Sequence, residues 1–177
     1  MEEENVLIKE RKKKLEQIRE MGINPFKYKY DVSHSSKDVQ DTFSDLQAEE
    51  KTGSEVSIAG RIMSFRMMGK AAFAHLQDQE GQIQVYFKKD DLGEENFSLL
   101  KLLDIGDFIG CLGTVFKTKK GELTVYVQDF ELLSKSLRPL PEKYHVVITA
   151  NEKLVEVIPE LKGKSNIEWI GKISKKG

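Results

Sequence analysis

The sequence predicts a mostly β protein built around a five-stranded Greek-key barrel. Three observations predict it. Apolar and polar residues alternate with a period of two from Val56 onward, turn residues interrupt this alternation at short intervals, and a helical pattern falls between the third and fourth strand-like runs. This order is typical of a small barrel of the OB type, in which the helix closes one open end. An open five-stranded meander is the alternative, but it would leave the position of the helix unexplained.

The barrel is predicted to span residues 56–134. Glycine-containing turns separate its strands, and a hairpin turn joins the last two. The expected elements are, in order, strands Val56–Phe65, Lys70–Gln77 and Gln82–Lys88, a helix Asp90–Leu103, and strands Phe108–Thr118 and Glu122–Leu133.

Two further regions flank the barrel. Residues 1–55 are expected to hold an amphipathic helix over Glu2–Met21, ended by Gly22 and Pro25, and then an acidic linker with one short helix near Asp38–Glu50. The apolar stripe of the first helix must dock on another part of the protein. Residues 135–177 are expected to form a post-barrel linker and a divergent tail.

Composition excludes several classes of protein. The chain has 177 residues, of which 39% are hydrophobic and 32% charged, with 28 basic and 29 acidic side chains. No apolar run approaches the ~20 residues that a membrane helix needs, and the first residues are acidic where a secretory signal would be basic. A lone cysteine, Cys111, suits a reducing compartment and permits no internal disulfide. The sequence therefore predicts a cytoplasmic protein that does not enter a membrane.

No catalytic constellation is recognisable in the sequence. His34, His75 and His145 lack the spacing of metal ligands, and with one cysteine no zinc cluster of thiolates forms. A glycine-rich phosphate loop is missing as well. Acidic pairs at 90–91 and 94–95 open a predicted helix, where the helix dipole favours negative charge. We therefore expect no metal, no cofactor and no catalytic residue in this chain.

Alternation assigns the second and third strands two different faces. One face is apolar and must line the barrel interior; it carries Ala72, Ala74, Leu76, Ile83, Val85 and Phe87. The other carries Phe73, His75, Gln77, Gln82, Gln84, Tyr86 and Lys88. In an OB barrel these two strands form the nucleic-acid surface, where aromatic rings stack on bases and amides bond to base edges. The alternative for Phe73 is packing beneath a loop or the N-terminal helix.

Several charged residues are candidates beside this surface, each with a plainer explanation. Arg66 and Lys70 flank the first turn and are candidates for phosphate or base contacts, or else solvated turn residues. Glu122 opens the fifth strand and is suited to accept a hydrogen bond from a base, or else to pair with Lys119 or Lys120 across the turn. The basic run at residues 9–14 of the first helix is more simply a solvated face than a phosphate contact.

A set of sequence strings resembles one family. The strings are Arg11, Lys14-Leu15 and Gly22-Ile23-Asn24-Pro25; Ala59-Gly60-Arg61-Ile62-Met63; Arg66-Met67-Met68-Gly69-Lys70-Ala71-Ala72-Phe73; Leu76-Gln77-Asp78 and Gly81-Gln82-Ile83-Gln84; Gly106-Asp107; Thr118-Lys119-Lys120-Gly121-Glu122-Leu123; and Lys135-Ser136-Leu137-Arg138-Pro139-Leu140-Pro141-Glu142-Lys143. Together they resemble the N-terminal anticodon-binding part of bacterial-type class II lysyl-tRNA synthetases, over roughly residues 6–145.

This resemblance implies a role for each matching residue. The barrel would grip the uridine-rich anticodon loop of the lysine tRNA, with Phe73 stacking on a uracil and Gln84 and Arg66 reading uracil edges. Glu122 would make a further base contact, and His75 and Lys70 would lie nearby with a weaker claim. The basic face of the first helix, with Lys12 and Lys13, would meet the tRNA backbone. In the family this region also contributes to a dimer, so a homodimer is the assembly that the resemblance implies.

The resemblance ends after His145, ahead of the catalytic domain of the family. None of the class II signature motifs is recognisable, so ATP and Mg²⁺ are implied only for the missing catalytic part. We expect this chain to be inactive alone, as a truncated anticodon-binding part of a lysine-tRNA ligase. The alternative function is a stand-alone OB module that binds single-stranded nucleic acid or serves a regulatory interaction. The tail from Val146 onward has no functional interpretation.

Overall fold

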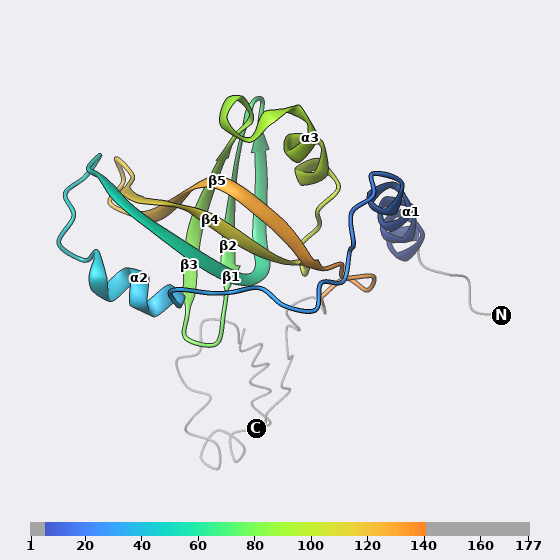
Figure 1. The fold of residues 1–177 in the computed structure, drawn as a ribbon, viewed down its shortest axis with the longest axis horizontal. Helices are drawn as coiled ribbons and strands as arrows, with labels where there is room; N and C mark the ends of the chain where they lie inside the picture. The colour runs from blue at the N-terminus through green and yellow to red at the C-terminus, as the bar shows by residue number, and fades with distance from the viewer. Residues whose placement is uncertain (1–5, 141–177) are drawn as a thin grey trace, which may run out of the picture. The chain divides into compact units, whose positions relative to one another are not determined.

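The computed structural model describes residues 6–140, and the predictions for residues 1–5 and for the tail from residue 141 lie outside them. Figure 1 shows a barrel with helices at its ends and edge. The elements are α1 (Val6–Glu20), α2 (Ser36–Thr42), β1 (Lys51–Met68), β2 (Ala71–Gln77), β3 (Gln82–Lys88), α3 (Lys89–Lys101), β4 (Phe108–Lys117) and β5 (Leu123–Ser134).

The sheet is a closed barrel with strand order β1-β2-β3-β5-β4. Neighbouring strands are antiparallel except β3 and β5, which pair in parallel and close the barrel. The five-stranded barrel with a helix between its third and fourth strands is therefore confirmed, and the open meander is not the structure of this chain.

Strand β1 is longer than predicted at both ends, Lys51–Met68 in place of Val56–Phe65. Its first half pairs with β4 and its second half with β2. The added segments, residues 51–55 and 66–68, are mostly exposed, so their pairing with β4 and β2 is what defines them as strand. Gly60 precedes Arg61, where the pairing of β1 passes from β4 to β2. Glycine is needed there, because a Cβ would lie 2.8 Å from the carbonyl oxygen of Gln77.

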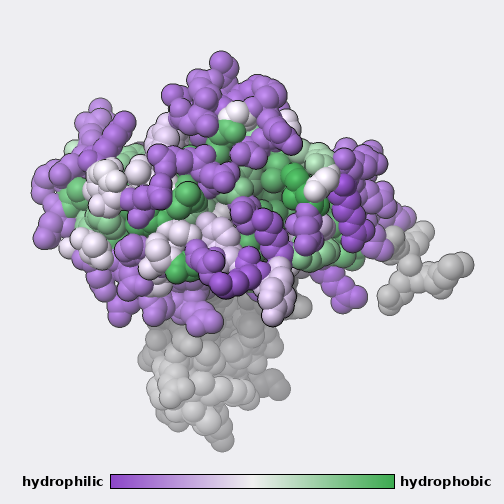
Figure 2. Space-filling model, viewed as in Figure 1, coloured by the Kyte–Doolittle hydropathy of each residue, from purple (hydrophilic) through white to green (hydrophobic). Residues whose placement is uncertain are grey.

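The predicted interior of the barrel is confirmed. Every inward-facing residue of β2 and β3 is at most 3% exposed: Ala72, Ala74, Leu76, Ile83, Val85 and Phe87. Removing this apolar surface from water is the main stabilising contribution. Figure 2 shows that hydrophilic side chains cover most of the outer surface on one face, with apolar surface visible between them.

Helix α3 contacts β3 and β5 at one end of the barrel, as Figure 1 shows. Phe97 and Leu100 are buried on the helix and Leu103 just beyond its end, as the sequence pattern predicted. The helix is interrupted at Gly93, where φ is +79°. The helix begins one residue earlier and ends two residues earlier than the predicted range of Asp90–Leu103.

Helix α2 is shorter than the segment near Asp38–Glu50 predicted for it and begins two residues earlier. Ser35 caps it in a capping box with Asp38. The Asp78 carboxylate in the β2–β3 turn accepts hydrogen bonds from the backbone N and the hydroxyl of Ser36, at 2.5 and 2.7 Å. These contacts determine where the helix begins, and no sequence period signals them.

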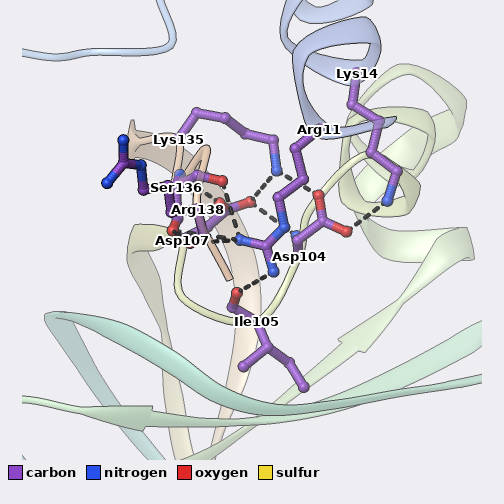
Figure 3. Close-up of polar contacts among 8 residues, drawn as sticks. All are labelled: Arg11, Lys14, Asp104, Ile105, Asp107, Lys135, Ser136 and Arg138. Atoms are coloured by element: carbon purple, nitrogen blue, oxygen red, sulfur yellow. Dashed lines mark hydrogen bonds and ion pairs between the residues drawn. The ribbon is translucent and has the colours of Figure 1, made fainter. Parts of the chain in front are cut away.

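Helix α1 docks through the stripe that the sequence predicted, with Leu15 and Ile18 buried. A charged cluster fixes its other contacts (Figure 3). Lys14 reaches Asp104 at 2.5 Å, and Arg11 donates to the backbone oxygens of Ile105, Ser136 and Arg138. The expectation that the basic run is mostly solvated is wrong for these two residues, because both contact the α3–β4 connection.

Lys135 lies at the centre of this cluster. Its side chain is fully buried and its Nζ lies 2.6 Å from Asp104 and 2.8 Å from Asp107, which is also fully buried. Figure 3 shows the lysine pointing from the segment after β5 toward both carboxylates. A buried charge requires such partners, because desolvation of an unpaired ion is costly.

We predict that Lys135→Met destabilises the protein by about 3–5 kcal/mol, because it leaves the buried carboxylate of Asp107 without its counter-charge, whereas Asp104 keeps Lys14. Urea-induced unfolding measures this free energy. The matched control is Lys29→Met, which breaks a lysine–aspartate pair (2.7 Å to Asp31) that is largely exposed and should cost at most ~1 kcal/mol. Equal losses in the two variants would contradict the role assigned to Lys135.

The Asp104 carboxylate should also make the free energy of unfolding fall at acid pH. Burial raises the pKa of its carboxyl, but hydrogen bonds and the charges of Lys135 and Lys14 outweigh burial and hold the pKa below its ordinary value. Its contribution is thus present above the unfolded-state pKa of about 4 and is lost as pH falls through the folded-state value. We predict a smaller fall of the unfolding free energy between pH 6 and 3 in Asp104→Asn than in the wild type.

Candidate nucleic-acid interface

Two rows of side chains cross the outer face of four barrel strands. We define the polar row as Ser64, His75, Gln84 and Thr124, which are consecutive cross-strand neighbours on β1, β2, β3 and β5. The aromatic row lies two residues further along each strand and consists of Arg66, Phe73, Tyr86 and Tyr126. Barrel closure through the parallel β3–β5 pair is what extends both rows onto β5.

Glu122 connects the members of the polar row. Its Oε1 lies 2.9 Å from His75 Nε2, and its Oε2 accepts a hydrogen bond of 2.7 Å from Gln84 Nε2. Because a carboxylate is an acceptor, the Nε2 atom of His75 carries the proton and donates it. In these contacts Glu122 pairs with His75 and Gln84, and not with Lys119 or Lys120, which the sequence offered as alternative partners.

The β4–β5 turn holds Glu122 in position. Its backbone N donates to Thr118 Oγ1 at 3.0 Å, while the backbone N of Thr118 donates to its carbonyl oxygen at 2.9 Å. Gly121 has a φ of +84°, which residues with a Cβ adopt at a cost. The turn therefore aims the carboxylate across the start of β5 toward β3.

The remaining contacts of the polar row fix its two ends. Ser64 Oγ lies 2.8 Å from His75 Nδ1, and the buried Thr124 hydroxyl donates to Gln84 Oε1 at 2.9 Å. Gln84 thus has its amide nitrogen bonded to Glu122 and its amide oxygen bonded to Thr124. Each of these amide atoms keeps one further hydrogen-bonding position. His75, Gln84 and Glu122 line one hollow together with the β4–β5 turn.

The aromatic row continues the surface beside the polar row. The ring centroids of Phe73 and Tyr86 are 4.7 Å apart, and those of Tyr86 and Tyr126 are 5.3 Å apart. Phe116 of β4 joins them at 6.3 Å from Tyr86 and 6.1 Å from Tyr126. Phe73 is half-buried and lines an open hollow next to Tyr86, in a position that suits stacking better than packing beneath a loop.

Arg66 and Lys70 lie at different places on this surface. Arg66 is exposed on β1 directly opposite Phe73. Lys70 lies in the β1–β2 turn beyond the aromatic row, exposed and 3.7 Å from Asp90. The structure therefore brings Arg66 to the candidate site with Phe73, but it does not bring Lys70 to the polar row.

Lys12 and Lys13 are exposed on α1, away from both rows. Their neighbours Arg11 and Lys14 anchor the helix to the α3–β4 connection. This anchoring fixes the direction in which the exposed lysines face. They form a basic surface separate from the strand face, suited to phosphates and unsuited to base edges.

Sequence reasoning missed four residues of this surface. Ser64 lies on β1 opposite His75. Thr124 and Tyr126 lie on β5, which barrel closure places beside β3, and Phe116 lies on β4, the next strand. Burial first, and then a hydrogen bond to Asp91 and its charge, raise the pKa of Tyr126 to about 12, so its phenol stays neutral near pH 7. Burial likewise raises the pKa of the Cys111 thiol, which is therefore unreactive.

The part of the chain that the structure describes was also searched for metal sites and membrane-spanning helices. Between residues 6 and 140, no three His, Cys, Asp or Glu side chains are grouped as metal ligands. Within the same range, no helix is long and apolar enough to cross a membrane.

Comparisons with known proteins agree with this geometry. Residues 56–133 match the model of a tRNA anticodon family described as an OB-fold nucleic acid binding domain. The chain is 50% identical over 142 residues to a lysine–tRNA ligase of Clostridium novyi, a match that covers 80% of this chain and 27% of that protein. It is 47% identical over 167 residues to that of Carboxydothermus hydrogenoformans, covering 91% and 33%, and 49% identical over 146 residues to that of Bacillus subtilis, covering 81% and 29%.

The chain thus spans about a third or less of the length of these curated relatives. The matched residues cover most of β1 and β5, all of β2, β3, α3 and β4, and both rows of the candidate site. The barrel of this chain therefore belongs to the family of tRNA anticodon-binding OB-fold domains, in the form that lysine–tRNA ligases carry.

Proposed function

We propose that this domain reads the uridine-rich anticodon of the lysine tRNA for a lysine–tRNA ligase. The observation that carries the proposal is the position of Gln84, whose amide is held by two hydrogen bonds next to the stacking surface of Phe73. A base stacked on Phe73 would present its edge toward the row of Gln84. Stacking supplies affinity and the amide supplies selectivity.

Uracil matches the free positions of the Gln84 amide. It carries an N3–H donor flanked by two carbonyl acceptors, so the amide oxygen can accept from N3–H while the amide nitrogen donates to a carbonyl. Arg66, opposite Phe73 on β1, is placed to donate to another oxygen of the same base. These contacts would leave no polar edge of the uracil unpaired.

Glu122 would enforce this choice by fixing the orientation of Gln84. A flipped amide would set its oxygen against the carboxylate, and two acceptors repel each other. Cytosine carries an acceptor at N3 and a donor at N4, so a flipped amide would read cytosine in place of uracil. Both Glu122 oxygens already have partners in the structure, so the residue acts here as a positioning residue for Gln84 and His75.

Phosphate contacts would complete the binding. Lys12 and Lys13 on α1 are exposed and are candidates for the tRNA backbone, and Lys70 extends the basic surface beyond Phe73. Such contacts release counterions, so affinity should fall steeply as salt rises. His75 would contribute to base recognition indirectly, because its hydrogen bond to Glu122 helps to hold that carboxylate in place.

The larger context of the domain is part of the same proposal. Because the curated relatives are lysine–tRNA ligases, we propose that amino acid activation, with its ATP and Mg²⁺, belongs to a catalytic part beyond this domain. We also propose that the protein acts in the cytoplasm as a homodimer. Sedimentation of the purified chain tests the dimer.

We predict that the chain binds an anticodon stem-loop with the lysine anticodon more tightly than loops in which one anticodon uridine is changed. Phe73→Ala should weaken this binding about 5- to 150-fold, since a base–aromatic stack is worth ~1–3 kcal/mol. Fluorescence anisotropy at low and moderate salt measures it. Tyr28→Ala, which removes a fully exposed ring outside both rows, is the control and should bind like the wild type. Equal binding of all loops would favour the alternative, a general single-stranded nucleic-acid module.

We further predict that Glu122→Ala weakens the discrimination between uridine and cytidine more than it weakens the affinity for the stem-loop. With the carboxylate gone, the Gln84 amide is free to flip, so the preference for uridine over cytidine at the base it reads should fall toward one. Gln84→Leu should also lose the preference, but with a larger loss of affinity for the uridine loop because its hydrogen bonds are removed. A Glu122→Ala variant that keeps the full preference would show that the carboxylate does not position the amide.

A further inference from the structure

Strand β1 contains an irregularity directly beside the polar row. On β1 the pairing with β2 advances from Ile62 to Ser64, whereas on β2 it moves by a single residue, from Leu76 to His75. Met63 is therefore an extra residue that β2 does not match, which is a β-bulge. In an unbroken ladder Met63, and not Ser64, would lie opposite His75.

The bulge decides which kind of side chain faces His75. A methionine sulfur is at best a weak acceptor and cannot donate, whereas a serine hydroxyl can do both. The bulge brings the hydroxyl oxygen of Ser64 to 2.8 Å from Nδ1 of His75. It also places Arg66 opposite Phe73 in the next pair of outward-facing residues. Bulges beside functional sites re-aim side chains in this way.

The ring of His75 is held at both of its nitrogens. Its Nε2–H donates to Glu122 Oε1 at 2.9 Å, so Nδ1 carries no proton in the neutral ring. The Ser64 hydroxyl donates to this bare nitrogen. The ring can turn about its Cβ–Cγ bond only if both hydrogen bonds break. This matters because the side chain of Glu122 is 47% exposed and depends on its partners for a fixed position.

We infer that Ser64 is a positioning residue for the selectivity of this surface and acts through His75 and Glu122. Without the hydroxyl, the ring of His75 is held at one nitrogen only, and water competes for its Nε2–H. Glu122 then loses its fixed partner on β2 and depends on Gln84, the amide that it has to orient. The inference rests on the proposed function, because it assigns a further residue to the selection of uridine.

Removing and restoring the hydroxyl tests the inference. Ser64→Ala should lower the preference for uridine over cytidine in the anticodon stem-loop about 2- to 10-fold, the effect of one hydrogen bond, with nearly unchanged affinity for the lysine loop. Ser64→Thr keeps a hydroxyl and should keep the preference. The matched control is Ser54→Ala, at an exposed position of β1 outside both rows, which should behave like the wild type. Fluorescence anisotropy measures each affinity.

Two further measurements separate positioning from direct contact with the RNA. In nitrogen NMR spectra of the isotopically labelled free chain, Ser64→Ala should speed the exchange of the His75 Nε2–H with water, and Ser64→Thr should not. The His75→Ala variant identifies this signal by its loss. That variant also keeps the bond between Gln84 and Glu122, so adding Ser64→Ala to it should lower the preference no further.

Several results would overturn the inference. They are an unchanged preference or an unchanged His75 signal in Ser64→Ala, an equal loss of affinity for every loop, and a loss of preference that persists in the His75→Ala background. Thermal unfolding verifies that each variant is folded. A wild-type chain that binds the uridine and cytidine loops equally would instead overturn the proposed function, even with a His75 signal that responds to Ser64→Ala as expected.

Discussion

The parallel pairing of β3 with β5 is the constraint on which the candidate site depends. It places Thr124 beside Gln84 and Tyr126 beside Tyr86, although about forty residues separate each pair in the chain. Without it both rows would end at β3, and the Gln84 amide would lack the hydroxyl and carboxylate that orient it. Closure also removes the free sheet edges that an open meander would expose. One pairing thus completes the barrel and assembles the surface for which we propose base recognition.

In the function we propose, the two rows divide recognition between them. Hydrogen bonds in the polar row are made before any RNA arrives, so binding a base requires little reordering of side chains. In the aromatic row, stacking contributes affinity without regard to base identity. In the function we propose, selectivity would therefore depend on the few atoms of Gln84, Glu122 and Thr124, whereas affinity would be spread over rings and lysines.

Basic residues serve two separate purposes in this domain. Lys135, Lys14 and Arg11 are committed to carboxylates and backbone oxygens around Asp104 and stabilise the docking of α1. Lys12 and Lys13, their neighbours in sequence, remain on the exposed side. A net charge of −1 hides this division, because the number of basic residues does not show which are buried in ion pairs.

The sequence by itself determined the barrel interior, the order of its elements and the outward placement of Phe73, His75 and Gln84, because a strand's period of two sorts side chains locally. It did not predict the full length of β1 or the start of α2, since their pairing with β4 and with Asp78 carries no periodic signal. It also gave no sign that Lys135 is buried. Only the tertiary structure decided that Glu122 bridges His75 and Gln84 and that Phe116 and Tyr126 join Phe73, because barrel closure brings distant segments together and local sequence does not encode which strands meet.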